Sequence, residues 1–341
     1  MNAPLQSVDS RRAGALLEVR NLQKFYGAAR TWFSRRQYPV QAVDDVSFDV
    51  ARGETLSLVG ESGCGKTTTA KSVLRLIEPT AGSVRLDGEE VTGLGREEMR
   101  QRRRDLQIIF QDPYASLNPR MTAGDIVAEP MRNFSLDGLT SEKARSERVK
   151  WLFSKVGLRA EAMKKYPYEF SGGQRQRLGI ARALALSPKL IVCDEPVSAL
   201  DVSVQAQVIN LLMDLQAEFG VAYLFVAHDL AVVRHISHRV AVMYLGKIVE
   251  IADRDTLFSS PRHPYTEILL SAVPAPTPGK RAERRVMSGD PPSPANPPTG
   301  CRFHPRCPLA APVCRQVSPS LTPRSDAVGA KTAHFVACHV R

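Results

Sequence analysis

The 341-residue sequence contains no long hydrophobic run, although hydrophobic residues make up 43% of it. A membrane-spanning helix needs roughly 18 or more consecutive apolar residues. The longest apolar stretches, such as Val221 to Ala227, have the length of a buried strand instead. The polar segment 1–15 lacks the apolar core of a signal peptide, and we expect it to be disordered. These absences predict a chain on the cytoplasmic side that reaches a membrane only through a partner.

Aromatic residues are scarce, at 6%, and acidic residues are too few to balance the basic ones, so the formal net charge is +11. A basic surface can bind nucleic acid or anionic lipid, or it can have no specific partner. The densest basic cluster, Arg100 to Arg104, lies beside Glu97, Glu98 and Asp105, and no aromatic side chain is interleaved to stack on bases. Mixed charges favour a solvated helix face. We therefore predict no nucleic-acid partner.

Cysteine is also rare, and four of the 6 cysteines lie near the C-terminus. These four are Cys301, Cys307, Cys314 and Cys338. Cytosolic proteins seldom use disulfides, so the cluster predicts a metal site. Four thiolates could hold a [4Fe–4S] cluster or a tetrahedral zinc ion, or the cysteines could bind no metal. The spacing lacks the short C-x2-C pair typical of zinc sites, which favours iron–sulfur.

A phosphate-binding loop is the strongest local pattern. The segment GESGCGKT matches G-x-x-x-x-G-K-[ST] between a predicted strand, Thr55 to Val59, and a helix predicted from Gly65 to about Leu76. Backbone N–H groups and the helix N-terminus would hold the phosphates, Lys66 would reach the β- and γ-phosphates, and Thr67 would bind Mg²⁺. A chance match in a Gly/Ser loop is the alternative, which this context disfavours. The candidate ATP-binding residues are Gly60, Glu61, Ser62, Gly63, Cys64, Gly65, Lys66, Thr67 and Thr68.

Two acidic residues end the hydrophobic strand predicted at Leu190 to Asp194. Ligand sites in open α/β sheets lie beyond such strand ends. Asp194 could therefore hold Mg²⁺, and Glu195 could accept a proton from an attacking water. The alternative is a solvated loop start, which the apolar residues before the pair make less favourable.

Strands that alternate with helices predict an α/β layer fold. Further strands are expected at Leu16 to Arg20, Val46 to Val50, Leu106 to Phe110, Tyr223 to Ala227, Arg239 to Tyr244 and Lys247 to Ile251. The stretch from about 112 to 186 has a helical character and would form an inserted subdomain. The proline-rich segment 274–298 is expected to be an extended linker.

A second candidate anion site is Ser171-Gly172-Gly173-Gln174, at the start of a basic helix, although an ordinary helix cap by Ser171 would explain it too. With it, the set resembles the nucleotide-binding subunit of an ATP-binding cassette (ABC) transporter over about residues 16–260. The motifs that carry the resemblance are the Walker A loop Gly60 to Thr67, the Q-loop Gln111, the signature Ser171 to Gln174, the Walker B strand Leu190 to Asp194, Glu195, the D-loop Ser198 to Asp201 and the H-loop His228. One departure is Phe170, where the family usually has Leu.

The resemblance implies roles that the residues alone do not. Tyr26 would stack on adenine, although a core aromatic at a strand end is the alternative. Gln111 would sense Mg²⁺ and the attacking water, and His228 would contact the γ-phosphate. Asp201 would couple two facing subunits. The family also implies a head-to-tail pair of ATPases in which the signature of one subunit closes over the ATP of the other.

The peptide-importer branch of the family resembles this chain most. The segments that carry this resemblance are Phe110 to Arg120, Asp194 to Leu212, His228 to Glu250, Pro261 to Pro274 and the cysteine tail, which would form an extension over 261–341. It implies a second ATPase subunit that is a different chain, two transmembrane permeases and an extracytoplasmic solute-binding protein, with the ATPase peripheral on the inner membrane. Nickel and glutathione importers are close alternatives. A soluble ABC ATPase acting on ribosomes or nucleic acid, or a regulator with a degenerate site, fits less well.

Overall fold

The structure is a computed structural model that describes residues 14–27, 39–134, 138–272, 289–324 and 333–341. The predicted disordered N-terminus lies almost wholly outside these residues, as does most of the predicted proline-rich linker. In the described ranges, no helix combines the length and apolarity that crossing a bilayer requires.

The central feature is a mixed sheet with the strand order β11-β12-β10-β9-β3-β8-β7-β6. Its strands are β3 (Thr55–Val59), β6 (Leu106–Ile109), β7 (Leu190–Asp194), β8 (Ala222–Val226), β9 (Arg239–Tyr244), β10 (Lys247–Asp253), β11 (Thr322–Arg324) and β12 (His334–Val336). The strands from β9 to β6 run parallel, and the remaining three pair antiparallel. β3, β7, β8 and β9 are buried along their whole length, which explains their almost unbroken apolar sequences.

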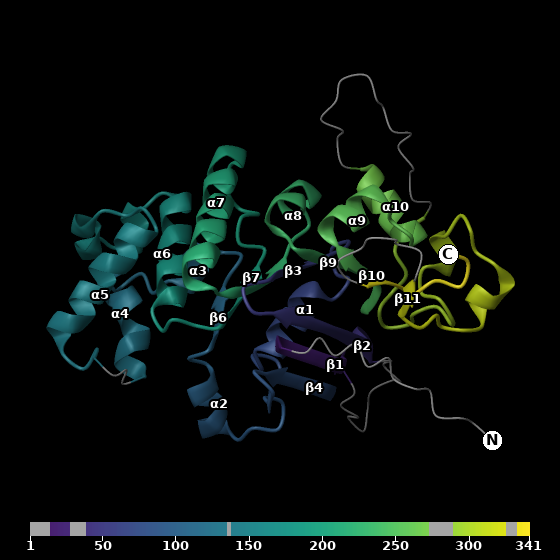
Figure 1. The fold of residues 1–341 in the computed structure, drawn as a ribbon, viewed down its shortest axis with the longest axis horizontal. Coiled ribbons are helices and arrows are strands. Elements are labelled where there is room, and N and C mark those ends of the chain that lie inside the picture. Colours follow the sequence, from purple (N-terminus) through teal and green to yellow (C-terminus); the bar gives the residue numbers. More distant parts are fainter. Residues whose placement is uncertain (1–13, 28–38, 135–137, 273–288, 325–332) are drawn as a thin grey trace, which may run out of the picture.

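A smaller antiparallel sheet packs on one face of the central sheet (Figure 1). It consists of β2 (Val40–Ala51), β1 (Ala15–Tyr26), β4 (Ala81–Leu86) and β5 (Glu89–Glu90), in that order. The helix α1 (Lys66–Val73) joins the same core through Ala70 and Val73. The start of α1 is thereby fixed against both sheets, which matters because it carries the candidate phosphate loop.

Helices cover the opposite face and form a separate lobe, seen at the left of Figure 1. α7 (Val202–Phe219), α8 (Leu230–Ile236), α9 (Arg254–Ser259) and α10 (Pro264–Ser271) share a core with the central sheet. The lobe contains α3 (Pro113–Ser116), α4 (Ala123–Asn133), α5 (Glu142–Lys155), η1 (Ala160–Lys164), η2 (Pro167–Glu169) and α6 (Gly172–Leu184). The predicted α/β fold with an antiparallel part and an inserted helical subdomain is therefore confirmed.

Several element boundaries differ from the sequence prediction. β1 and β2 are 12 residues each, far longer than expected, because irregularities in their pairing interrupt the simple alternation of apolar residues. α1 ends at Val73 rather than near Leu76, since Arg75 adopts a left-handed φ of 47° that no helix continues through. The predicted extended linker 274–298 is described only from residue 289, and there the Gln41 N–H donates to the carbonyl of Pro294 at 3.0 Å.

The C-terminal tail is part of the central sheet, which the sequence did not predict. β12 pairs with β10, and β11 pairs with β12. Glu250 on β10 is fully buried and accepts hydrogen bonds from the N–H groups of Arg262 and His263, and it contacts His334 Nε2 at 2.7 Å. The buried Glu250 carboxylate thus connects the start of α10 and β12 to β10 of the main domain.

Candidate functional site

The phosphate loop connects β3 to α1 and has a backbone that only glycine can adopt at two positions. Gly60 has a φ of 151° and Gly65 a φ of 108°, both in the region that side chains disfavour. A Cβ atom at Gly60 would lie 2.2 Å from the Met243 carbonyl oxygen, and one at Gly65 would lie 2.2 Å from that of Ala42. The glycines therefore let the loop press against β9 and β2.

Lys66 is the first residue of α1 and is only 5% exposed. Its ammonium group donates to the carbonyl oxygens of Gly60 and Glu61 at 2.9 and 3.0 Å. The side chain thus folds back over the loop. A buried lysine needs such partners, and these two leave its charge at the centre of the loop, where a phosphate would meet it.

Thr67 and Asp194 supply hard oxygen atoms beside the loop. The Thr67 hydroxyl donates to Asp194 Oδ1 at 2.8 Å, and Lys71 Nζ lies 3.9 Å from Asp194 Oδ2. Burial raises the pKa of Asp194, while the Thr67 hydrogen bond and the Lys71 charge oppose that shift. A hydroxyl next to a carboxylate is the donor set that Mg²⁺ prefers, so these residues fit that ion.

Glu195 follows Asp194 at the tip of β7 in a left-handed conformation with a φ of 49°. Gln111 Nε2 donates to Glu195 Oε2 at 2.9 Å, and His228 Nδ1 lies 3.3 Å from the same oxygen. A strained backbone held by contacts from two other strand ends is typical of functional positions. The structure thus brings together three residues that the sequence separates widely.

A pocket of about 300 Å³ lies over these groups. Its lining consists of Ala42, Ser62, Gly63, Gly65, Lys66, Thr67, Thr68, Gln111 and Glu195. The phosphate loop, the Q-loop residue and the acidic strand end therefore share one cavity.

Several predicted site residues do not line this cavity within the described residues, among them Asp194, His228 and the groups at Tyr26, Ser171 and Asp201. Tyr26 ends β1 beside the undescribed segment 28–38, 39% exposed, with Lys24 Nζ 5.1 Å from its ring centroid. Ser171 begins α6, where its hydroxyl accepts the Gln174 N–H at 3.3 Å and its own N–H donates to Gln174 Oε1 at 3.0 Å. Asp201 begins α7, exposed and without a side-chain capping bond.

The cysteines are all free thiols. Burial raises the pKa of Cys301 to about 11, and the nearby thiols of Cys307, Cys314 and Cys338 act in the same direction. The four tail cysteines therefore gather in one region of the extension. Within the residues that the structure describes, however, no three or more Cys, His, Asp or Glu side chains are arranged to hold a metal ion.

Sequence reasoning missed three residues that contact the site. Lys71 lies one helical turn after Thr67, a spacing that could have suggested it. Tyr265 accepts the Glu61 N–H at 2.8 Å, and Arg306 forms an ion pair with Glu61 at 2.9 Å. These two come from the segment after residue 260, and no local pattern connects them to the phosphate loop.

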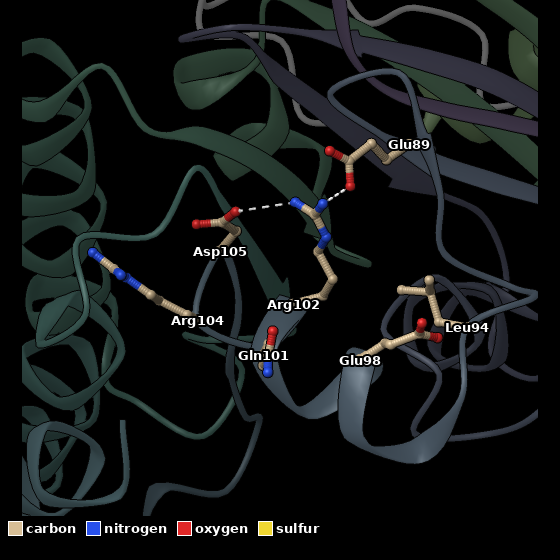
Figure 2. A pocket seen from close by; sticks show the side chains of 7 residues that line it. All are labelled: Glu89, Leu94, Glu98, Gln101, Arg102, Arg104 and Asp105. Carbon is tan, nitrogen blue, oxygen red and sulfur yellow. Dashed lines mark ion pairs between the residues drawn. The ribbon is translucent and has the colours of Figure 1, made fainter. Parts of the chain in front are cut away.

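The basic cluster of the sequence forms α2 (Arg96–Arg102) and the turn after it, where it lines a pocket of about 430 Å³ (Figure 2). Arg102 points between Glu89 and Asp105 and forms an ion pair with each. Arg100 pairs with Glu97 at 3.0 Å. The pairing of these opposite charges agrees with the predicted solvated helix face.

The fold and the pocket define the class: this is a P-loop ATP-binding protein with an inserted helical subdomain. The sequence model described as "ABC transporter" matches residues 43–198, and the "Oligopeptide/dipeptide transporter, C-terminal region" model matches residues 249–314. The chain belongs to the ATP-binding proteins of ABC transporters, in the peptide and oligopeptide branch. It is therefore an ATPase of the kind coupled to transport, and the predicted family is confirmed.

Relatives of known description cover nearly the whole chain. The probable peptide ABC transporter ATP-binding protein y4tS of Sinorhizobium fredii is 56% identical, with 96% of this chain and 90% of the relative aligned. The oligopeptide transport ATP-binding protein AppF of Bacillus subtilis is 49% identical, over 95% and 97%. The oligopeptide transport ATP-binding protein OppF of Salmonella typhimurium is 51% identical, over 90% and 92%.

Solved structures show the same fold. The dimeric post-hydrolysis structure of the ATP-binding cassette MJ0796 bound to ADP and Pi matches with a TM-score of 0.62 and 30% identity, covering 70% of this chain and 98% of that one. A second dimeric structure of MJ0796, described as a bacterial ABC transporter cassette, matches with a TM-score of 0.61. The ABC ATPase fold implies ATP and Mg²⁺ as ligands.

Proposed function

We propose that this chain binds and hydrolyses ATP to drive an importer of di- or oligopeptides from the cytoplasmic face of the inner membrane. Its partners would be a second, different ATPase subunit, two transmembrane permeases and an extracytoplasmic solute-binding protein. The observation that carries the proposal is the pocket in which Lys66, Thr67 and Glu195 meet, together with a C-terminal region similar to that of peptide transporters.

The phosphate loop and Lys66 would bind the triphosphate. Lys66 already lies beneath the pocket, so binding requires it only to exchange loop carbonyls for phosphate oxygens. Thr67 and Asp194 would hold Mg²⁺, which neutralises charge on the phosphates. Gln111 is assigned to the same ion: its amide nitrogen donates to Glu195, and its amide oxygen would be the atom that binds the metal.

Glu195 would take the proton from the attacking water. Gln111 and His228 both contact Oε2, and this fixes the direction of the carboxylate. The other oxygen, Oε1, is then free to receive the proton in a defined geometry. The 58% exposure of the His228 side chain leaves it accessible to a γ-phosphate that enters the pocket.

The Ser171–Gln174 signature and Asp201 would act on the ATP of a facing subunit. Both lie at helix starts outside this chain's own pocket, where they are available to a partner. ATP would then hold two subunits together, and hydrolysis would release them, which is a two-state element controlled by the γ-phosphate. Tyr26 would stack on the adenine at the exposed end of β1.

For the tail we propose a [4Fe–4S] cluster on Cys301, Cys307, Cys314 and Cys338, with zinc as the alternative. The gathering of four free thiols supports it, while the described side chains lack a ligand arrangement, so no catalytic step is assigned to the metal. Absorbance near 400 nm after anaerobic purification would be typical of iron–sulfur. Stoichiometric zinc without iron would contradict it.

Purification from native membranes tests the transport proposal. Two permeases, a second ATPase and a solute-binding protein should co-purify with the chain, and peptide uptake by vesicles should stop with Glu195→Gln. Glu218→Gln is a matched control, because it neutralises an exposed carboxylate on α7. Association with ribosomes instead, or ATP-driven uptake of nickel or glutathione but no peptide, would contradict the proposal.

A further inference from the structure

The C-terminal extension places an arginine directly on the phosphate loop. Arg306 Nη1 lies 2.9 Å from Glu61 Oε2, and Nη2 donates to Glu61 Oε1 at 3.2 Å. Two parallel N–H bonds between one guanidinium and one carboxylate form the most directional ion pair that proteins use. The Arg306 side chain is 7% exposed and that of Glu61 25%, so water screens the pair only partly.

The segment that carries Arg306 is anchored in the core of the main domain. Phe303 is 1% exposed and packs edge-on against Tyr244 of β9, with ring centroids 5.1 Å apart. Tyr265 of α10 lies 5.4 Å from the same ring. Arg302 pairs with Asp44 Oδ2 and also donates to the Leu245 carbonyl, both at 2.5 Å. Anchors on β2, β9 and α10 therefore fix the position of Arg306.

Glu61 in turn is held at three points. Its side chain pairs with Arg306, its N–H donates to Tyr265 Oη at 2.8 Å, and its carbonyl oxygen accepts from Lys66 Nζ at 3.0 Å. Glu61 is also the second residue of the loop that would receive a polyanion. A carboxylate left without its arginine at this place would repel phosphate and would lose one of its three restraints.

Building on the proposed nucleotide site, we propose that Arg306 is a positioning residue for the phosphate loop. It acts through Glu61: it neutralises the Glu61 carboxylate and holds the loop in the form that accepts the phosphates. The extension is thereby a structural component of the ATP site, whatever the tail cysteines bind.

A double-mutant cycle tests this with the full chain and ATP as the titrated ligand. Arg306→Ala should weaken ATP affinity on the order of tenfold, because it leaves the Glu61 carboxylate uncompensated. In a Glu61→Gln background the same change should cost less than about threefold, because no charge remains to compensate. Arg306→Lys should fall between, since an ammonium cannot make two parallel bonds. Arg315→Ala, an exposed arginine of the same extension, is the matched control.

In the assembled transporter, Arg306→Ala should raise the KM for ATP and leave kcat nearly unchanged. The proposal would be overturned if Arg306→Ala lowered ATP affinity equally in the parent and Glu61→Gln backgrounds, or in neither. It would also be overturned if Arg306→Ala unfolded the chain and Glu61→Gln did not restore folding. Lys66→Ala, measured in parallel, separates a failure of the proposed nucleotide site from a failure of the role proposed for Arg306. Undiminished ATP binding in that variant would remove the nucleotide site itself, whereas a negative result at Arg306 alone would leave it intact.

Discussion

The chain presents two glycine-containing segments at helix starts, and they are built in opposite ways. The loop Gly60 to Thr67 leaves its groups open towards a cavity and is supported from outside by Ala42, Tyr265 and Arg306. The signature Ser171 to Gln174 closes on itself in a reciprocal capping box. The first segment can therefore bind a phosphate within this chain. In the second, the side chains of Ser171 and Gln174 already bond the helix start.

That difference explains how one chain can carry two anion-binding patterns for one nucleotide. An open loop needs restraints from neighbouring elements, because otherwise its backbone N–H groups would turn towards other partners. A capped helix start needs no such support and can be presented to another subunit. Variants in the two segments test whether binding and hydrolysis divide between them in this way.

The largest effect is expected at the tip of β7. Glu195→Gln should lower ATP turnover on the order of 10²- to 10⁴-fold, because the amide cannot accept the proton of the attacking water. ATP binding should remain, and the closed subunit pair should accumulate, which gel filtration with ATP would reveal. Normal turnover in this variant would remove Glu195 from the mechanism.

Removing the Lys66 ammonium group from the phosphate loop should weaken ATP binding and not only ATP turnover. Lys66→Ala is expected to reduce ATP affinity on the order of 100-fold, because a buried charge-assisted contact to phosphate is lost. Calorimetry on the full chain measures it. Lys150→Ala, on the solvent side of α5 beside Glu147, is the matched control. Unchanged affinity in Lys66→Ala would mean that the loop does not hold the phosphates.

Acid should lower the stability of the segment around His263 and Tyr265, which contacts the phosphate loop at Glu61. Burial lowers the pKa of His263 from 6.5 to about 4, and its Nδ1 accepts the N–H of Tyr265 at 3.1 Å. Between these two pKa values the unfolded chain binds a proton that the folded chain excludes. Stability is therefore complete above about pH 6.5 and falls as the pH drops towards 4, by about 2 kcal/mol between pH 7 and pH 5.

His263→Asn isolates this contribution, because asparagine can also cap α10 but does not titrate. Urea unfolding at pH 7 and pH 5 should show a smaller acid loss in the variant than in the parent chain. An identical loss in both would assign the acid sensitivity to other groups.

The smallest effect on stability is expected at the signature. Ser171→Ala should cost about 1 kcal/mol of folding free energy, because the cap of α6 is lost. ATP affinity of the single chain should persist, while turnover of the assembled pair should fall. Ser141→Ala removes the equivalent cap of α5 and should cost similar stability without the loss of turnover. Equal turnover in the two variants would show that the signature is only a cap.

Most of the site could be predicted from the sequence, because its parts are short local patterns. The strand Thr55 to Val59 and the strand Leu190 to Asp194 have the predicted bounds. Thr67 and Asp194, 127 positions apart, are both predicted to hold Mg²⁺, and their side chains are in contact. The roles of all the site residues stay predictions, and those of Ser171 and Asp201 depend on atoms outside this chain.

The sequence by itself determined the α/β fold, the phosphate loop and the acidic strand end, because periodicity and turn chemistry act between neighbours in the chain. Only the tertiary structure decided that the tail adds strands to the central sheet and that Arg306 meets Glu61, 245 residues away in sequence. Such a contact depends on how distant elements pack, and a single arginine in a segment without periodicity gives no sign of its partner.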